Sequence, residues 1–240
     1  MNIALIGYGK MGQTIERLAI QRGHSIVLKI MLENKEEMTH ENLRKADVAI
    51  EFTSPDVALE NVLMTLGAGV PIVSGTTGWN DELDKAGKTA IQQGAAFLHT
   101  SNFSVGVNIF FEINKVLAEL MNEQPNYEVT IEETHHVEKK DAPSGTAITL
   151  ANQVLANLKR KDHWTSEKES DKNALPVISH RIEVVPGTHH VKYSSPIDDI
   201  EIIHTAHNRD GFALGALLAA EYVAGKHGVF TMRDVLGIGR

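Results

Sequence analysis

The sequence contains no cysteine, which excludes disulfide bonds, thiolate nucleophiles and zinc–thiolate sites. It also has no apolar run near the roughly 18 residues that a membrane-spanning helix requires. Met1 leads directly into the apolar segment Asn2–Ile6, without the basic and apolar regions of a signal peptide. We therefore expect a cytoplasmic protein with no membrane partner.

Positive charge is also scarce. The 23 lysines and arginines are outnumbered by 31 acidic residues, and the formal net charge is −8. General nucleic-acid binding needs a basic surface, so we expect no nucleic-acid partner. This charge does not exclude a small anionic ligand, because a pocket can be locally positive. The length of 240 residues suits one large or two small domains.

Short apolar runs alternate with helical patterns in the N-terminal part of the chain. Strands are expected at 2–6, 25–31, 47–52, 71–74 and 95–99, and helices at 13–21, 57–66 and 81–93. This alternation is typical of βαβ units, which form a doubly wound parallel sheet through right-handed crossovers. The sequence therefore predicts an α/β fold with an N-terminal Rossmann-like dinucleotide-binding domain.

The rest of the chain has strands that follow one another. Helices are expected at 105–122 and 146–159, and strands at 128–134, 177–185, 189–194 and 199–204, with a charged surface loop at 159–172. This order predicts a second α+β domain with an antiparallel or mixed sheet and an open face. An apolar helix at 212–224 is expected to pack back on the first domain. The predicted domains are 1–104 completed by 210–240, and 105–209 for substrate binding and oligomerisation.

A glycine-rich segment follows the first predicted strand. It reads Gly7-Tyr8-Gly9-Lys10-Met11-Gly12 and matches G-x-G-x-x-G between a strand and a helix. Glycines allow the backbone to approach a pyrophosphate closely, and the helix N-terminus favours its negative charge. The alternative is a glycine-rich turn without a ligand. The complete strand–turn–helix context favours dinucleotide binding.

Two further loops follow predicted parallel strands. They are Gly75-Thr76-Thr77-Gly78 and Thr100-Ser101-Asn102-Phe103. Ligands of open α/β sheets bind outside the carboxyl ends of the strands, so we expect both loops to line the cofactor groove. The alternative is that they are ordinary turns in which Asn102 or Ser104 caps a helix.

The densest polar cluster lies between Glu132 and Asp141 and contains His135, His136 and Lys139. Histidine and lysine can transfer protons at a reactive centre. A solvated strand end would use the same residue types, and the residues alone do not decide between the two. The following Ser144-Gly145-Thr146 opens a helix whose free N–H groups suit a carboxylate or phosphate.

We expect no metal site in this cluster, because adjacent histidines on a strand point to opposite faces. His189, His190, His204 and His207 lie on strands or at their ends and are interpreted as mostly structural. For Arg209, before the last long helix, a surface salt bridge and a functional role remain open.

Together these segments resemble the 4-hydroxy-tetrahydrodipicolinate (dihydrodipicolinate) reductase family of bacterial lysine biosynthesis. Residues 133–146 fit its motif E-x-H-H-x-x-K-x-D-A-P-S-G-T throughout, and 50–55, 75–78, 102–108 and 232–236 also resemble family sequence. The chain departs from the family in a shorter first glycine loop and a reduced segment between Asn34 and Asp47. Neither departure removes a catalytic group.

The resemblance implies a role for each matching residue. His135 is similar to the family's proton donor or acceptor, and Lys139 to its proton-donating lysine. The implied substrate-binding residues are His136, Ser144, Gly145 and Thr146. The implied cofactor contacts are Gly7, Tyr8, Gly9, Lys10, Met11, Gly12, Gly75, Thr76, Thr77, Thr100, Ser101, Asn102 and Phe103, with Arg209 and Phe212 as weaker matches. A homotetramer and closure about hinges near 103–105 and 209–211 are also expected.

The resemblance further implies reduction of a cyclic imine with two carboxylates by NADPH or NADH. Loss of the 4-hydroxyl as water leaves a conjugated imine, which accepts hydride at ring carbon 4. Other readings are another two-domain oxidoreductase, such as an amino-acid dehydrogenase, or a non-catalytic dinucleotide sensor. Dinucleotide folds that prefer NADH carry an acidic residue at the end of the second strand, where this chain has Met31. We therefore expect both cofactors to be used, with NADPH at least as good, unless Glu33 takes the acidic role.

Overall fold

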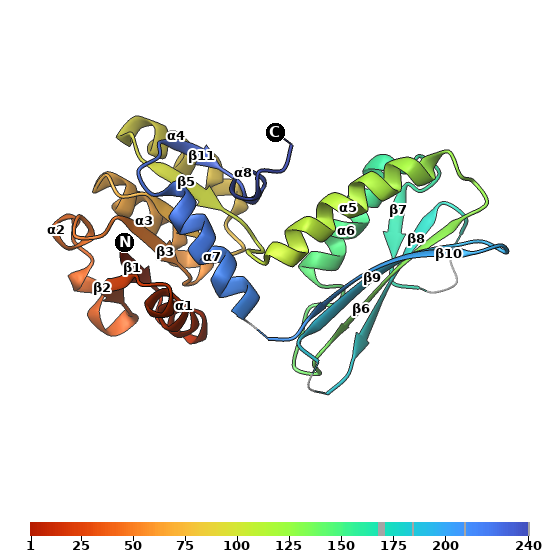
Figure 1. Ribbon diagram of the computed structural model, residues 1–240, viewed down its shortest axis with the longest axis horizontal. Coiled ribbons are helices and arrows are strands. Elements are labelled where there is room, and N and C mark those ends of the chain that lie inside the picture. Colours follow the sequence, from red (N-terminus) through yellow and green to blue (C-terminus); the bar gives the residue numbers. More distant parts are fainter. Residues whose placement is uncertain (168–170, 184, 209, 240) are drawn as a thin grey trace. The chain divides into compact units, whose positions relative to one another are not determined.

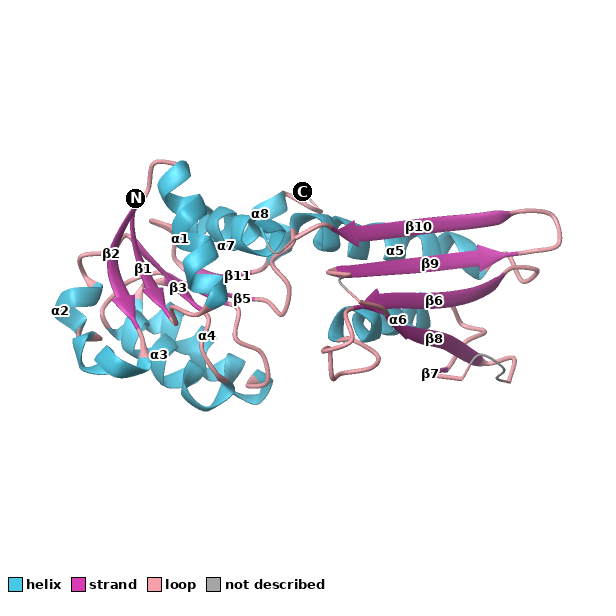
Figure 2. Cartoon of the chain, turned by 90° about the horizontal axis from the view of Figure 1, so that it is seen from below, coloured by secondary structure: helices cyan, strands magenta, loops and turns pink. Residues whose placement is uncertain are grey.

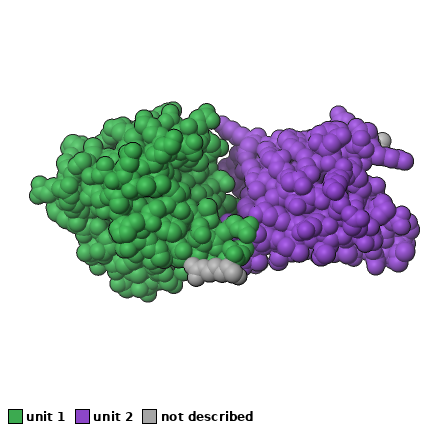
Figure 3. All heavy atoms as spheres, turned by 90° about the horizontal axis from the view of Figure 1, so that it is seen from above, with its two compact units in different colours: residues 1–105, 209–240 green, residues 106–208 purple. Residues whose placement is uncertain are grey.

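The computed structural model describes residues 1–167, 171–183, 185–208 and 210–239 (Figure 1). The chain divides into two compact units, residues 1–105 with 209–240 and residues 106–208 (Figure 3). Within the described residues, no helix combines the length and the apolar character needed to cross a bilayer. Each unit has its own sheet and its own apolar core.

The sheet of unit 1 is entirely parallel and has the strand order β11-β5-β4-β3-β1-β2. Its strands are β1 (Asn2–Ile6), β2 (Ser25–Ile30), β3 (Val48–Glu51), β4 (Ile72–Ser74), β5 (Ala96–His99) and β11 (Gly228–Phe230). The chain runs outward from β1 in both directions, as in a doubly wound sheet. The predicted Rossmann-like fold is therefore confirmed.

Helices cover both faces of this sheet. They are α1 (Lys10–Gln21), α3 (Pro55–Gly67), α4 (Leu83–Gln93) and α7 (Asp210–Val223), with shorter turns η1 (Leu32–Glu37), α2 (His40–Leu43), η2 (Asn80–Glu82) and α8 (Met232–Leu236). Residues of α7 such as Ala216 and Leu217 are buried in one cluster with Ile3 and Leu5 of β1. Helix α7 therefore packs against the sheet of unit 1.

Unit 2 has a mixed sheet in the order β10-β9-β6-β8-β7. The strands are β6 (Glu128–His135), β7 (His163–Thr165), β8 (Ala174–Arg181), β9 (Gly187–Ser194) and β10 (Asp199–Ala206). Helices α5 (Val105–Asn122) and α6 (Gly145–Asn157) lie on one face of the sheet (Figure 2). The mixed sheet was predicted. The expected loop at 159–172 is wrong in part, because β7 forms there by pairing with β8.

Candidate active site and dinucleotide groove

The glycine turn after β1 is packed too closely for side chains at two positions. A Cβ on Gly7, whose φ is +92°, would lie 1.9 Å from the carbonyl oxygen of Phe52. A Cβ on Gly12 would lie 2.4 Å from the carbonyl oxygen of Gly7. Gly9, by contrast, has open space around its Cβ position and caps α1 without a side-chain hydrogen bond. The first N–H groups of α1 are therefore available to an anion such as a pyrophosphate.

Two adjoining pockets lie at the carboxyl ends of the parallel strands, each about 500 Å³ in volume. The first is lined mainly by the glycine turn, the loop after β2 and the start of α3: Ile6, Gly7, Tyr8, Gly9, Ile30, Met31, Leu32, Glu33, Lys35, Thr53, Ser54, Val57 and Asn61. The second is lined by Gly9, Lys10, Met11, Gly12, Phe52, Thr53, Pro55, Gly75, Thr76 and Thr77. Gly9 and Thr53 line both pockets, so a dinucleotide could extend from one to the other. The free space at the Cβ position of Gly9 and the helix start without a side-chain cap both suit a dinucleotide.

A buried carboxylate supports the floor of this groove. Glu51, at the end of β3, is fully buried and accepts hydrogen bonds from Ser74 Oγ (2.5 Å), Thr76 Oγ1 (2.7 Å) and the Thr53 N–H (2.9 Å). These bonds fix the loops after β3 and β4 to each other. Neither Glu51 nor Thr53 was predicted as a site residue, because their link to Thr76 depends on the strand order.

The predicted cofactor loop 100–103 lines neither of these two pockets. Phe103 is 2% exposed, and its ring packs against Phe52 with centroids 5.7 Å apart. The Asn102 N–H donates to Thr100 Oγ1 at 3.2 Å, which closes the turn locally. Phe212 lies half-buried in the first turn of α7. Arg209 lies outside the described residues.

A second polar centre lies within unit 2, and strand pairing creates it. In β6 the residues Val129, Ile131, Glu133 and His135 are buried on the helix-covered face. The parallel pairing with β8 places Glu133 beside Ser179 and His135 beside Arg181. The antiparallel pairing with β9 places His189 on the other side of Glu133. Three strands therefore bring their polar side chains to one buried point.

Glu133 is the hub of this centre and is 0% exposed. Its Oε1 accepts hydrogen bonds from Ser179 Oγ (2.8 Å), the Ser144 N–H (3.0 Å) and Arg181 Nη2 (3.1 Å). Burial alone would raise the pKa of Glu133, but the contact with His135 and the hydrogen bonds from Ser144 and Ser179 outweigh it and hold the pKa well below the usual range. Glu133 is therefore an ionised carboxylate at neutral pH.

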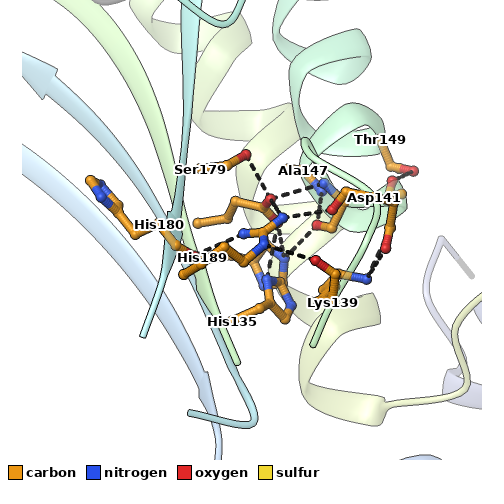
Figure 4. A network of polar contacts seen from close by, with 12 residues as sticks. His135, Lys139, Asp141, Ala147, Thr149, Ser179, His180 and His189 are labelled. Atoms are coloured by element: carbon orange, nitrogen blue, oxygen red, sulfur yellow. Dashed lines mark hydrogen bonds and ion pairs between the residues drawn. The ribbon is translucent and has the colours of Figure 1, made fainter. Parts of the chain in front are cut away.

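Two imidazole rings face the other oxygen of Glu133. His135 Nδ1 lies 3.1 Å from Oε2, close enough for an ion pair, although its N–H is not aligned for a hydrogen bond. The His189 ring meets the His135 ring edge-on at 5.1 Å, and its Nε2 is 3.2 Å from Ser144 Oγ (Figure 4). Burial lowers the pKa of His189 to about 4, so this ring is neutral at physiological pH.

Lys139 lies in the loop that follows β6. Its Nζ contacts both carboxylate oxygens of Asp141, at 2.8 and 2.9 Å, and this bond lowers the pKa of Asp141 (Figure 4). Arg181 donates hydrogen bonds to the carbonyl oxygens of Lys139 (3.3 Å) and Asp141 (2.6 Å). The lysine loop is thus attached to the same arginine that pairs with Glu133. His136 follows β6 directly and is half-buried.

The start of α6 completes the centre. Ser144 is buried, and its Oγ accepts a hydrogen bond from the Ala147 N–H at 3.2 Å, which caps the helix. Gly145 is exposed, with nothing within 4 Å of its Cβ position, and the half-buried Thr146 follows it. An anion can therefore approach the helix start at Gly145. The structure brings the predicted residues His135, Ser144 and Lys139 into one network. Four residues that were not predicted as site residues belong to it as well: Glu133, Arg181, Ser179 and His189.

Among the described residues, Glu133, His135 and His189 also form a group with the spacing of metal ligands, their ligand atoms lying within 4.8 Å of one another. The sequence argument against a metal concerned only His135 and His136, so it did not consider this group. Arg181 already pairs with the carboxylate of Glu133 and brings positive charge to it. The positive charge of Arg181 would repel a metal cation, so it favours Glu133 as the partner of Arg181 rather than as a metal ligand.

Comparison with known proteins decides the family. Residues 1–103 match the model for the N-terminus of dihydrodipicolinate reductase, and residues 106–236 match the model for its C-terminus. The chain belongs to the dihydrodipicolinate reductase family. It is therefore an oxidoreductase whose nucleotide-binding unit takes NADPH or NADH, and the predicted family is confirmed.

Relatives in this family resemble the chain over nearly its full length. The 4-hydroxy-tetrahydrodipicolinate reductase of Christiangramia forsetii is 50% identical and is matched over 98% of both chains. That of Clostridium novyi is 35% identical, over 95% of this chain and 94% of the other. The dipicolinate-bound dihydrodipicolinate reductase from Paenisporosarcina sp. TG-14 has the same fold, with a TM-score of 0.80, 22% identity and 98% coverage of both chains.

Proposed function

We propose that the protein reduces 4-hydroxy-tetrahydrodipicolinate to tetrahydrodipicolinate, in the diaminopimelate route to lysine, with NADPH or NADH as reductant. The observation that carries this proposal is the Glu133-centred network, which joins His135, the predicted proton-transfer residue, to an open helix start. The names of relatives at 50% and 35% identity support the same reaction. As a biosynthetic step with soluble substrates, it belongs in the cytoplasm.

In this proposal the predicted N-terminal domain, 1–104 completed by 210–240, binds the cofactor, and the predicted second domain, 105–209, binds the substrate. The cofactor would lie along the groove formed by Gly7–Gly12 and Gly75–Thr77 and would supply hydride. His136 and the helix start at 144–146 would hold the substrate carboxylates through N–H groups and hydroxyls. His135 would exchange a proton with the substrate, and Lys139 would donate one as negative charge reaches the ring nitrogen.

The test is the reductase activity of the purified protein, measured as the decrease in absorbance of the reduced nicotinamide. We expect His135→Gln and Lys139→Ala each to lower kcat by roughly 10²–10⁴-fold. Cofactor KM should hardly change, since neither residue lines the two cofactor pockets. Full activity in either variant would contradict its catalytic assignment.

Dipicolinate separates this proposal from the other readings, since the solved relative from Paenisporosarcina sp. TG-14 is described as dipicolinate-bound. We expect competitive inhibition against the cyclic substrate and weaker inhibition after Thr146→Val. An amino-acid dehydrogenase would instead oxidise amino acids with NADP⁺ or NAD⁺ and ignore dipicolinate. A dinucleotide sensor would bind the cofactor and show no turnover.

A further inference from the structure

The carboxylate of Glu133 connects two parts of the proposed site. Its Oε1 accepts the N–H of Ser144 at the helix start (3.0 Å), and its Oε2 lies 3.1 Å from His135 Nδ1. We propose that Glu133 is the positioning residue of the reaction, which holds His135 in the Nδ1-protonated form and sets its ring against the carboxylate-binding start of α6. This inference rests on the proposed function, because it assigns Glu133 a role through His135.

The proton between Glu133 and His135 must belong to the ring. Oε1 accepts three hydrogen bonds, one of them from the cationic Arg181, and no proton is needed to satisfy that oxygen. An ionised carboxylate can only accept hydrogen bonds, so a stable contact at Oε2 requires Nδ1 of His135 to carry hydrogen. A small rotation of the ring would align this N–H. The carboxylate of Glu133 therefore sets the tautomer of His135, as carboxylates hydrogen-bonded to histidines do in other proteins.

His189 does not replace His135 as the partner of Glu133. Its Nε2 is 3.8 Å from Glu133 Oε2 but 3.2 Å from Ser144 Oγ. It is also buried and neutral at physiological pH. The edge-on contact of the two rings, at 71°, limits how far the His135 ring can turn. His189 thus forms a wall beside His135, while Glu133 faces its Nδ1.

This arrangement leaves Nε2 as the atom of His135 that exchanges a proton. When the ring is protonated, Nε2 can donate its proton to the substrate, and His135 returns to the neutral Nδ1–H form. Through this cycle Glu133 keeps its negative charge and remains unprotonated, so it balances the charge of the imidazolium without joining the transfer. Glu133 also accepts a hydrogen bond from the Ser144 N–H. This one side chain therefore sets the distance between the proton on His135 and the substrate carboxylate at the helix start.

The first experiment needs no variant of Glu133. Protein labelled with ¹⁵N-histidine is studied by long-range ¹H–¹⁵N correlation NMR, and the His135 signals are identified by their loss in His135→Gln. We expect the neutral ring to be protonated at Nδ1 and bare at Nε2. A neutral ring protonated at Nε2 would overturn the proposal, whether or not the protein has the proposed activity.

The second experiment compares Glu133→Gln with Glu132→Gln. Glu132 is the matched control, since it is the next residue on β6 but lies on the opposite, exposed face. We expect Glu133→Gln to lower kcat by roughly 10²–10³-fold, as loss of the correct tautomer does for other histidine–carboxylate pairs. Cofactor KM should not change, and Glu132→Gln should match wild type.

A double variant distinguishes positioning from a structural role. If Glu133 acts through His135, adding Glu133→Gln to His135→Gln should cause no further loss of kcat. An additive loss, or an unchanged kcat in Glu133→Gln alone, would show that Glu133 does not act through the ring. If the wild type lacked reductase activity altogether, the proposed function would fail, while the NMR result would still decide the tautomer.

Discussion

The glycine at position 187 leaves no side chain against Nε2 of His135. A Cβ at this position would lie 2.9 Å from Nε2 and 3.1 Å from the adjacent ring carbon. The ring cannot easily move away, because Glu133 contacts Nδ1 and the His189 ring packs against it edge-on. We expect Gly187→Ala to lower kcat by about tenfold or more through this crowding.

The measurement is steady-state kinetics with each substrate varied in turn. Cofactor KM should stay as in wild type, because Gly187 lines neither of the two pockets in unit 1. Gly69→Ala is a control elsewhere in the chain, with open space at its Cβ position but a positive φ of +76°. It should cost stability and leave kcat alone. Equal kcat values for the wild type and Gly187→Ala would mean that Nε2 does not need this space.

His189 should make the stability of the protein depend on pH. Its pKa is about 4 in the folded protein, because of burial, against an ordinary value of 6.5. The unfolded chain therefore binds a proton more readily, and stability falls as pH decreases from about 6.5 to about 4. The loss is on the order of 3 kcal/mol for a shift of this size. Glu133, with its lowered pKa, adds a further loss only below its ordinary value of 4.5.

Urea unfolding at several pH values measures this effect. We expect the slope of unfolding free energy between pH values of about 6.5 and 4.5 to be smaller in His189→Gln than in wild type. His207→Gln, which changes an exposed histidine, should leave the slope unchanged. Identical slopes in His189→Gln and wild type would contradict the buried, neutral state of this ring.

At the scale of elements, local pattern predicted most of the fold. Strand β1 has the predicted bounds 2–6, and no end of β2 to β5 differs from prediction by more than one residue, because each is a short buried run between turns. β7 and β11 were missed, since each has three residues and lies at a sheet edge, where burial leaves little pattern. β7 also lies in a polar segment and depends on pairing with β8.

The same limit explains which site residues were found. His135, Lys139 and Ser144 lie within one short segment, so spacing and resemblance could identify them. Ser179 and His189 join Glu133 only through the pairing of β6 with β8 and β9, and Ser179 is 46 residues away in sequence. No local periodicity contains that information. The metal-like grouping of Glu133, His135 and His189 escaped sequence reasoning for the same reason.

The loop after β2 should determine cofactor choice. Met31 and Glu33 line the first pocket with Lys35, but Lys35 is paired with Glu60 at 3.0 Å and Lys29 with Glu16 at 2.6 Å. The lysines therefore attract a 2′-phosphate less than free cations would. Glu33 follows the end of the strand by three residues and is exposed. We still expect both cofactors to be used, with NADPH at least as good, because no carboxylate occupies position 31.

Values of kcat/KM for NADPH and NADH at low ionic strength test this, in wild type and Glu33→Ala. Glu36→Ala is a matched control, as a neighbouring exposed carboxylate that does not line the pocket. We expect little change of preference in either variant. A strong NADH preference that disappears only in Glu33→Ala would show that Glu33 binds the ribose hydroxyls and repels the phosphate.

At the scale of the whole molecule, the face of the unit 2 sheet opposite α5 and α6 is available to contact another subunit. Ile203 of β10 is 57% exposed and pairs with His190 of β9. The neighbouring pair on the same face of the sheet, the face without helices, is Glu201 with Lys192. The resemblance to the dihydrodipicolinate reductase family implies a homotetramer, and the open face of this sheet is the surface that we expect its subunits to share. We therefore expect a homotetramer with four times the chain mass of 26.3 kDa.

Light scattering coupled to size-exclusion chromatography measures this mass directly. Ile203→Asp should reduce it, because a carboxylate buried between subunits would lose its hydration without gaining a partner. Ile91→Asp is the matched control, since Ile91 is 67% exposed but belongs to α4 of unit 1 and not to this sheet. Its mass should equal that of wild type. A monomeric wild type would refute the tetramer, and a full-sized Ile203→Asp assembly would show that the subunits meet on another surface.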